Sequence, residues 1–175
     1  MNSEFQQTLK NLSFTTYHHN QLTTFDYDDI FADRRVIIFS VPQFRTISSG
    51  RHSQDYINNA ECFLNNGIDG LYAIDSTDWL IGPMMDKKSK VVVGLPDRDC
   101  KFIVALAEYY KYQKPIGELS RLWQYVTIIN NGEPEKIWYN PFKADTKLVI
   151  LKDSTYRYRK LSADVVLKYL VDTPK

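Results

Sequence analysis

A serine and a histidine follow a strongly apolar segment, and their types could support nucleophilic chemistry. Residues 35–41 are mostly β-branched or aromatic, and the chain then passes Pro42 and Thr46 to reach Ser49. His52 lies three residues further on, so it could act as a base that activates the Ser49 hydroxyl for hydrolysis. Side chains on one tight turn rarely aim at each other, and no third group that would orient the histidine is evident. The sequence therefore favours a helix cap and turn here.

The two cysteines are the other nucleophile candidates. Cys62 falls inside a predicted helix beside an aromatic residue, which favours a small buried apolar role. Cys100 falls in the first turn of a helix that Asp97 opens, where helix amides could stabilise a thiolate. The carboxylates of Asp97 and Asp99 oppose that effect, so we expect a capped surface turn. With no CxxC spacing, two cysteines do not make a disulfide framework.

Residues that could bind a metal ion are present but badly spaced. His18, His19 and His52 do not form a ligand triad. The acidic segment 75–78 could hold a cation, but helix capping explains it better. We expect no metal and no cofactor.

The bulk composition indicates an ordinary globular domain. The 175 residues include 22 basic and 21 acidic side chains, so the net charge of +1 does not suggest a nucleic-acid partner. No apolar stretch approaches the roughly 20 residues of a membrane span, and residues 1–7 do not resemble a secretory signal. We expect one domain over residues 1–175, a cytoplasmic location without a membrane partner, and an N-terminal segment at 1–20 that could be flexible.

The hydrophobic period alternates between two and 3.6 residues along the chain. We expect strands at 35–41, 71–75, 91–95, 125–129 and 136–139, and helices at 54–64, from Asp97 and from Ser162. The inward-facing helical residues would be Tyr56, Ile57, Ala60, Phe63 and Leu64, then Phe102, Ile103, Leu106, Ala107 and Tyr110, and finally Val165, Val166 and Leu170. Asn131-Gly132 predicts a hairpin turn. This order predicts an α/β thioredoxin-like sandwich, a central mixed β-sheet flanked by helices, in a single domain.

The segment Pro42-x-x-x-Thr46-x-x-Ser49 resembles the active-site pattern Pro-x-x-x-Thr-x-x-Cys of the peroxiredoxins. The chain also resembles the atypical fifth group of that family over about residues 20–172. The segments that carry this resemblance are 26–42, Ile74-Asp75-Ser76-Thr77-Asp78-Trp79, Gly94-Leu95-Pro96-Asp97 with Phe102, Asn140, and 161–170. The resemblance implies thiol-dependent peroxide reduction by the final cysteine, assisted by an arginine from a later strand.

Both chemical groups that the resemblance requires are replaced in this chain. Ser49 stands at the peroxidatic cysteine position, with Ser48 as the alternative if the register shifts by one. Gln124 stands at the arginine position, and Arg121 lies three residues earlier. Ile47 also replaces a usual proline. A hydroxyl has no appreciable anion at neutral pH without a nearby base.

Two functions from different classes follow. The first is a degenerate peroxiredoxin-like binding or scaffold module, whose former peroxide pocket would take a small anion or polar ligand. The alternative is an active oxidoreductase, either with a natural cysteine at position 49 replaced here or with Cys100 in an unusual role.

The resemblance also implies a homodimer that pairs through loops around the active-site corner. Apolar residues fall on the corresponding loops, and these are Phe44, Trp79-Leu80-Ile81, Pro115-Ile116 and Leu122-Trp123. Apolar groups on loops suggest a buried contact, although they could instead cover the edge of the monomer core. The segment 145–160 alternates like an extra strand or hairpin and could be a docking site for a partner.

Overall fold

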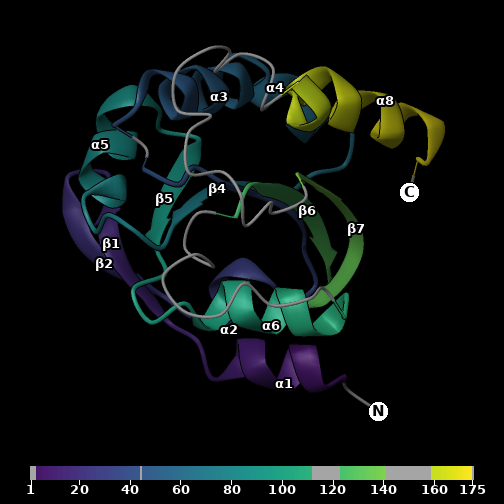
Figure 1. Cartoon of the computed structure of the whole chain (residues 1–175), viewed down its shortest axis with the longest axis horizontal. Helices are drawn as coiled ribbons and strands as arrows, with labels where there is room; N and C mark the ends of the chain where they lie inside the picture. Colours follow the sequence, from purple (N-terminus) through teal and green to yellow (C-terminus); the bar gives the residue numbers. More distant parts are fainter. Residues whose placement is uncertain (1–2, 44, 112–122, 141–158, 175) are drawn as a thin grey trace, which may run out of the picture.

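A five-stranded mixed β-sheet forms the centre of the fold (Figure 1). The computed structural model describes residues 3–43, 45–111, 123–140 and 159–174. The strands are β3 (Arg35–Ser40), β4 (Gly70–Asp75), β5 (Val92–Pro96), β6 (Tyr125–Asn130) and β7 (Glu133–Tyr139), in the spatial order β5-β4-β3-β6-β7. β3, β4 and β5 are parallel, whereas β6 and β7 are antiparallel to their neighbours. The predicted thioredoxin-like sandwich and its strands are confirmed.

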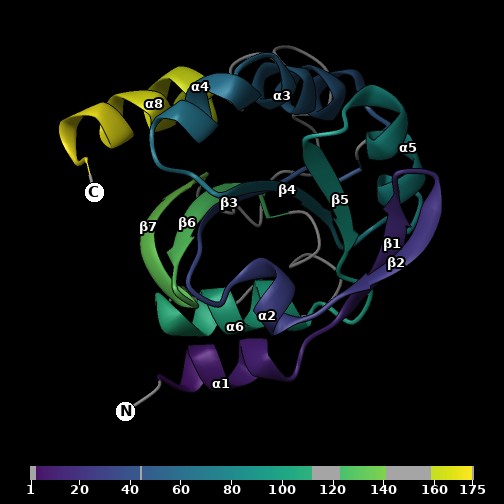
Figure 2. The same ribbon diagram turned by 180° about the vertical axis from the view of Figure 1, so that it is seen from behind.

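Helices cover both faces of this sheet (Figures 1 and 2). One face carries α3 (Ile47–Asn58), α4 (Ala60–Asn65) and α8 (Ala163–Asp172), and the other carries α1 (Glu4–Lys10), α2 (Tyr27–Ile30) and α6 (Lys101–Tyr109). α5 (Ile81–Lys88) lies beside β5, and a short 3-10 helix η2 (Arg159–Leu161) precedes α8. No helix within the described part of the chain is long and apolar enough to cross a membrane.

The central strand β3 is buried along its whole length because both of its faces are covered. Alternate side chains point to opposite faces of the sheet, so Val36 and Ile38 pack in one core while Ile37 and Phe39 pack in the other. The run of apolar residues that predicted this strand is continuous because side chains on both faces of β3 are packed in a core.

The helix expected at 54–64 is longer than predicted and is interrupted. It begins at Ile47 and ends at Asn58, and a second helix starts at Ala60 after the cap residue Asn59. As expected, Ala60 is buried, but Leu64 is 40% exposed because it falls on the outer side of the short α4. The last helix begins after Ser162 as predicted, and its first amide, that of Ala163, donates to the carboxylate of Asp55 at 2.8 Å. Val165, expected to face inward, is 36% exposed on that helix.

The N-terminal segment differs from the flexible stretch that composition suggests. Residues 3–20 include α1 and β1 (Phe14–His18), and the buried apolar side chains of Phe5 and Leu9 belong to the core cluster on the α6 face. The sequence around these residues is mostly polar, because only every fourth residue of α1 and every second residue at the start of β1 is buried. The contribution of this segment to the core is therefore hard to see from the sequence.

A two-stranded hairpin that the sequence did not reveal joins β1 to β2 (Gln21–Phe25). Its turn residues His19 and Asn20 have φ angles of 50° and 62°, as a type I′ turn requires. The Asp86 carboxylate of α5 accepts both turn amides, from His19 at 2.9 Å and from Asn20 at 3.0 Å. A partner 66 residues away therefore stabilises this turn.

Candidate functional site

The Ser49 corner lies where β3 ends and α3 begins. Val41 extends β3 by donating its amide to the carbonyl oxygen of Ile74 at 2.9 Å. The chain then turns, and Thr46 becomes the N-cap of α3, its hydroxyl oxygen accepting the amide of Ser49 at 3.4 Å. The N-cap is thus Thr46 rather than the expected Ser48-Ser49-Gly50 turn, because Ser48 and Ser49 already lie in the first helical turn.

Ser49 is buried beneath the loop that precedes α3. Its side chain hydroxyl donates to the carbonyl oxygen of Pro42 at 2.7 Å, and the residue is only 1% exposed. A hydroxyl has one proton to donate, so this contact directs that proton to the backbone. The arrangement closes the loop and does not present a nucleophile to solvent.

Ser48 is the more accessible of the two serines. It is half-buried, and its hydroxyl oxygen lies 3.4 Å from that of Thr46, which is exposed. The first amides of a helix have no partner within the helix, and they favour a negatively charged or polar group. The polar surface at this corner therefore consists of Thr46, Ser48 and the first α3 amides.

His52 does not complete a hydrolytic pair with Ser49. Its ring packs edge-on against Phe39 and Tyr56, with centroid distances of 5.7 and 5.1 Å. Burial lowers the pKa of His52 to about 3, because charging the ring in this apolar setting is unfavourable. Since the Ser49 proton is directed to Pro42, the geometry supports a packing role for the histidine.

Gln124 lies at the same end of the central strands as the Ser49 corner. It immediately precedes β6, and the amide of Tyr125 donates to the hydroxyl oxygen of Ser40 at 2.8 Å. The Gln124 side chain oxygen accepts a hydrogen bond from the side chain amide of Asn140 at 2.8 Å. The structure therefore brings the start of β6 to the end of β3. Arg121 lies outside the described residues.

Ser40 is a positioning residue that the sequence reasoning missed. It is buried at the end of β3, and its hydroxyl holds the first residue of β6. A polar residue directly after the apolar run 36–39 is the only sequence signal that could have indicated it.

The acidic segment 75–78 forms turns. The Asp75 carboxylate accepts the amide and the hydroxyl of Thr77 at 2.7 and 2.6 Å, and Asp78 accepts the amide of Leu80 at 2.9 Å. Asp78 also forms an ion pair with Arg45 at 2.9 Å. Within the described ranges, no group of three or more histidine, cysteine or acidic side chains could hold a metal ion.

The two cysteines differ from their expected settings. Cys62 is exposed on α4, not buried. Cys100 is buried rather than on a surface turn, and it adopts a left-handed conformation with φ of 56° directly before α6. The helix amides next to it are already taken, since the Asp97 carboxylate accepts those of Phe102 and Ile103 at 3.3 and 3.2 Å. The N-cap residue of this helix is Cys100 rather than the predicted Asp97, although the Asp97 side chain accepts the first helix amides as a cap would. Burial raises the pKa of the Asp97 carboxyl.

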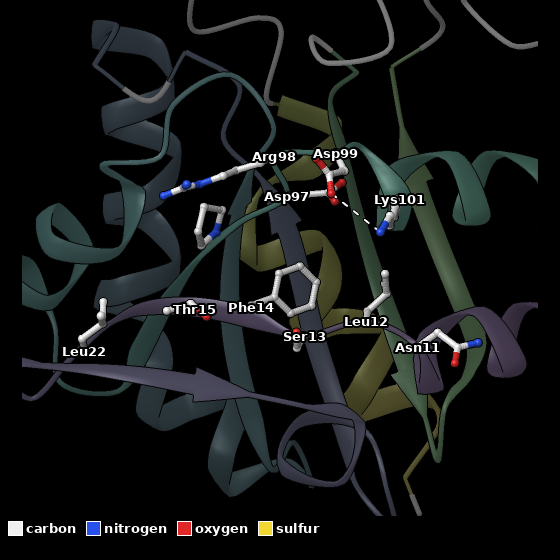
Figure 3. A pocket seen from close by; sticks show the side chains of 11 residues that line it. Asn11, Leu12, Ser13, Phe14, Thr15, Leu22, Asp97, Arg98, Asp99 and Lys101 are labelled. Carbon is white, nitrogen blue, oxygen red and sulfur yellow. Dashed lines mark ion pairs between the residues drawn. The ribbon is translucent and has the colours of Figure 1, made fainter.

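A pocket of about 480 Å³ lies beside Asp97, between the start of β1 and the β5–α6 loop (Figure 3). It is lined by Asn11, Leu12, Ser13, Phe14, Thr15, Leu22, Pro96, Asp97, Arg98, Asp99 and Lys101. Neither Ser49 nor Gln124 is among these residues, so this pocket is separate from the Ser49 corner.

Comparison with known proteins finds similarity to peroxiredoxins. No family model matches the chain. The hybrid peroxiredoxin hyPrx5 of Haemophilus influenzae is 23% identical over 173 residues, which cover 97% of this chain and 67% of that protein. A peroxiredoxin of Rhizobium etli is 32% identical over 111 residues, which cover 62% of each chain. The names of both relatives support the peroxiredoxin family for this chain.

A solved peroxiredoxin has a similar fold. Reduced Prx3 of Vibrio vulnificus, solved in complex with H₂O₂, superposes with a TM-score of 0.67 at 19% identity and covers 98% of this chain. The chain spans only 67% and 62% of the length of the two curated relatives above.

Proposed function

We propose that this peroxiredoxin-family chain has lost thiol-dependent peroxide reduction at the Ser49 corner and acts there as a binding or scaffold module. The observation that carries the proposal is the hydrogen bond from the Ser49 hydroxyl to the Pro42 carbonyl oxygen at 2.7 Å. Peroxide reduction by a peroxiredoxin needs a thiolate, and a buried hydroxyl that donates its proton to the backbone supplies neither sulfur nor an anion.

The environment of Gln124 supports the same proposal. An arginine at this position would bring positive charge and several N–H donors to the developing transition state. Gln124 is neutral, and its carbonyl oxygen is engaged by Asn140 at 2.8 Å. The electrostatic contribution that the family's arginine provides is therefore missing together with the thiol.

A small anion or polar molecule is the ligand that we propose for this corner. It would contact Thr46, Ser48 and the first α3 amides, because Ser49 is only 1% exposed. The Arg45 side chain is 60% exposed beside this turn, although it is paired with Asp78. The ligand would thus contact the more exposed side chains of Thr46 and Ser48 rather than the buried Ser49 at the former nucleophile position.

Homodimer formation through the corner is part of the proposal. The amide of Gln43 donates to the Thr77 hydroxyl at 3.0 Å, so the loops before α3 and before α5 lie side by side. Ile47 is 72% exposed on the first loop-to-helix junction, and Trp79 is 60% exposed on the second loop. Two such apolar side chains on adjacent loops would be covered by a second copy.

Other residues expected in this contact have different settings. Ile81 and Trp123 are buried in the monomer, and thus belong to its core instead. Phe44, Pro115, Ile116 and Leu122 lie outside the described residues, as do residues 145–158 of the segment considered for partner docking. We also propose a cytoplasmic location, because Cys62 and Cys100 of this chain are not joined in a disulfide.

A peroxide consumption assay tests the loss of activity. The purified chain, supplied with dithiol reductants and either H₂O₂ or an alkyl hydroperoxide, should consume no more peroxide than buffer does. Turnover above buffer that thiol blocking abolishes would overturn the proposal, and the Cys100→Ser variant would then show whether that thiol is responsible. A cysteine codon at position 49 of the natural gene would also contradict it.

A further inference from the structure

The outer edge of β2 is an open sheet edge without charge. β2 pairs with β1 on one side, and no described strand pairs with its other side. Its five residues, Gln21–Phe25, include no charged residue and no proline. The hairpin lies at the periphery of the molecule in both views (Figures 1 and 2). Such an edge is a template for pairing with another strand.

The other edges of the molecule are protected, which makes β2 unusual. β7 carries Pro134 and Glu135 and pairs with β6 through a register irregularity at Ile128/Ile129. β5 is covered by the hairpin itself, since the Thr16 hydroxyl donates to the carbonyl oxygen of Gly94 at 2.6 Å. Prolines, charges, bulges and covering elements are the usual devices that prevent edge-to-edge association. β2 has none of them.

The exposed face of the hairpin is uncharged as well. Thr15 and Tyr17 of β1 stand opposite Thr24 and Leu22 of β2, and the two threonine hydroxyls are 2.9 Å apart. Leu22 is 69% exposed and Tyr17 is 43% exposed. A strand added beside β2 would cover Leu22 and extend this uncharged face.

We propose that a second copy of this chain adds its own β2 antiparallel to this edge, forming a four-stranded sheet across a two-fold axis at Thr23. In that register Leu22 stands opposite the second copy's Thr24, and the two Leu22 side chains become diagonal neighbours on the exposed face. The strand is therefore self-complementary, as an isologous contact requires.

The acidic residues that follow β2 favour an antiparallel arrangement over a parallel one. His18 and His19 precede the strand, whereas the exposed acidic residues Asp26 and Asp28 follow it. Antiparallel pairing places the histidine end of one copy beside the acidic end of the other. Parallel pairing would instead place acidic residues beside acidic residues, which is unfavourable. A second copy thus fits both the uncharged centre and the two polar ends of the strand.

The contact is small, so we expect it to be weak and concentration-dependent. A stable interface buries about 1,600 Å² in total, more than one five-residue strand edge provides. This surface is distinct from the Ser49 corner, and variants at each surface separate the two associations.

Cross-linking tests the proposed register. In the full chain carrying Cys62→Ser, which removes the exposed native thiol, Thr23→Cys places two thiols opposite each other across the axis. Opposite residues of antiparallel strands have Cα atoms about 4.5–5.5 Å apart, within the span of a disulfide. Mild oxidation should give a disulfide-linked dimer, and adding Leu22→Lys should reduce its yield several-fold. Thr15→Cys in the same background, on the inner strand, should give no dimer.

Sedimentation of variants without added cysteines gives an independent measurement. Thr24→Lys and Thr15→Lys both disrupt the Thr15–Thr24 hydroxyl contact and add one charge, but only the former changes the edge strand. In an Ile47→Asp background, which removes the corner contact, Thr24→Lys should weaken self-association about tenfold or more, because each lysine then stands opposite the second copy's Leu22 and the two lysines become diagonal neighbours across the axis. Thr15→Lys should leave it unchanged. Equal effects of the two lysines, equal cross-linking from Thr15→Cys, or a constant mass of one chain at all concentrations would overturn the proposal.

Discussion

The Ser49 hydroxyl and the Pro42 carbonyl oxygen are 2.7 Å apart, and this hydrogen bond links the first turn of α3 to the end of the preceding strand segment. The bond spans seven residues and closes the loop that would otherwise open the corner to solvent. A buried hydrogen bond of this kind typically contributes about 1 kcal/mol to stability. Ser49 is thus a structural residue in this chain.

Restoring the missing groups should restore reactivity only in combination. Ser49→Cys alone should react slowly with peroxide, because Gln124 is neutral and is held by Asn140. Loss of one electrostatic donor commonly costs about 10²–10³ in rate. We therefore expect Ser49→Cys with Gln124→Arg to exceed the single variant by roughly that factor, measured by stopped-flow peroxide consumption.

Two controls make the rescue experiment informative. Gln124→Lys adds charge without the planar guanidinium and should give a smaller gain than Gln124→Arg. If Ser49→Cys alone is as fast as the double variant, Gln124 is misassigned, and Arg121 becomes the residue to replace.

The corner contact should respond to a charge at Ile47. Ile47→Asp places a carboxylate in the first turn of α3, which the helix dipole tolerates, so the monomer should remain folded. Because this change puts a charge into the proposed dimer contact, light scattering should show a shift towards the mass of one chain. Val171→Asp on α8 is the matched control, since Val171 is 63% exposed and lies on another surface. Equal effects of the two variants would contradict the corner dimer.

Asp86 should stabilise the β1–β2 hairpin in a pH-dependent manner. Hydrogen bonds from the amide of Asn20, the Lys90 side chain and the amide of His19 lower the pKa of Asp86 from 3.8 to about 2. A carboxyl with a lowered pKa contributes its stability above its ordinary pKa, and that contribution disappears as the pH falls through the folded value. Asp86→Asn should therefore lower the thermal midpoint at pH 7, and its difference from the unchanged protein should shrink between about pH 4 and pH 2.

The exposed residue Asp172 supplies the control for this measurement. Asp172→Asn on α8 removes a carboxylate without disturbing the hairpin, so its thermal midpoint should change little at either pH. A constant difference for Asp86→Asn across the acidic range would show that the carboxylate charge is not what stabilises the turn.

Burial of His52 should make the protein sensitive to mild acid. Its pKa is about 3 in the folded chain, against an ordinary value of 6.5. As the pH falls, the histidine of the unfolded chain is protonated before that of the folded chain. Stability is therefore lost between pH 6.5 and about pH 3, by an amount on the order of 5 kcal/mol. His52→Gln should flatten this part of the profile of unfolding free energy against pH, whereas His19→Gln, at an exposed position, should not. Parallel profiles for the unchanged protein and His52→Gln would contradict the assignment.

The order of the main elements could be predicted because burial leaves a local pattern. The continuous apolar run at 36–39 became the centre of the doubly covered β3, and Asn131-Gly132 became the turn between β6 and β7, with φ angles of 50° and 75°. The β1–β2 hairpin left a weaker pattern. Its turn uses His19 and Asn20, whose unusual φ angles are stabilised by a carboxylate from α5 rather than by residue type alone.

The sequence by itself determined the chemical identities at the corner: a serine at position 49, a glutamine at 124 and a threonine at 46. Only the tertiary structure decided what these groups contact. Thr46 rather than Ser48 became the N-cap, the Ser49 hydroxyl turned to Pro42, and Gln124 met Asn140. The physical reason is that periodicity along the chain records which residues are buried, whereas hydrogen-bond partners depend on segments that only the packed sheet brings together.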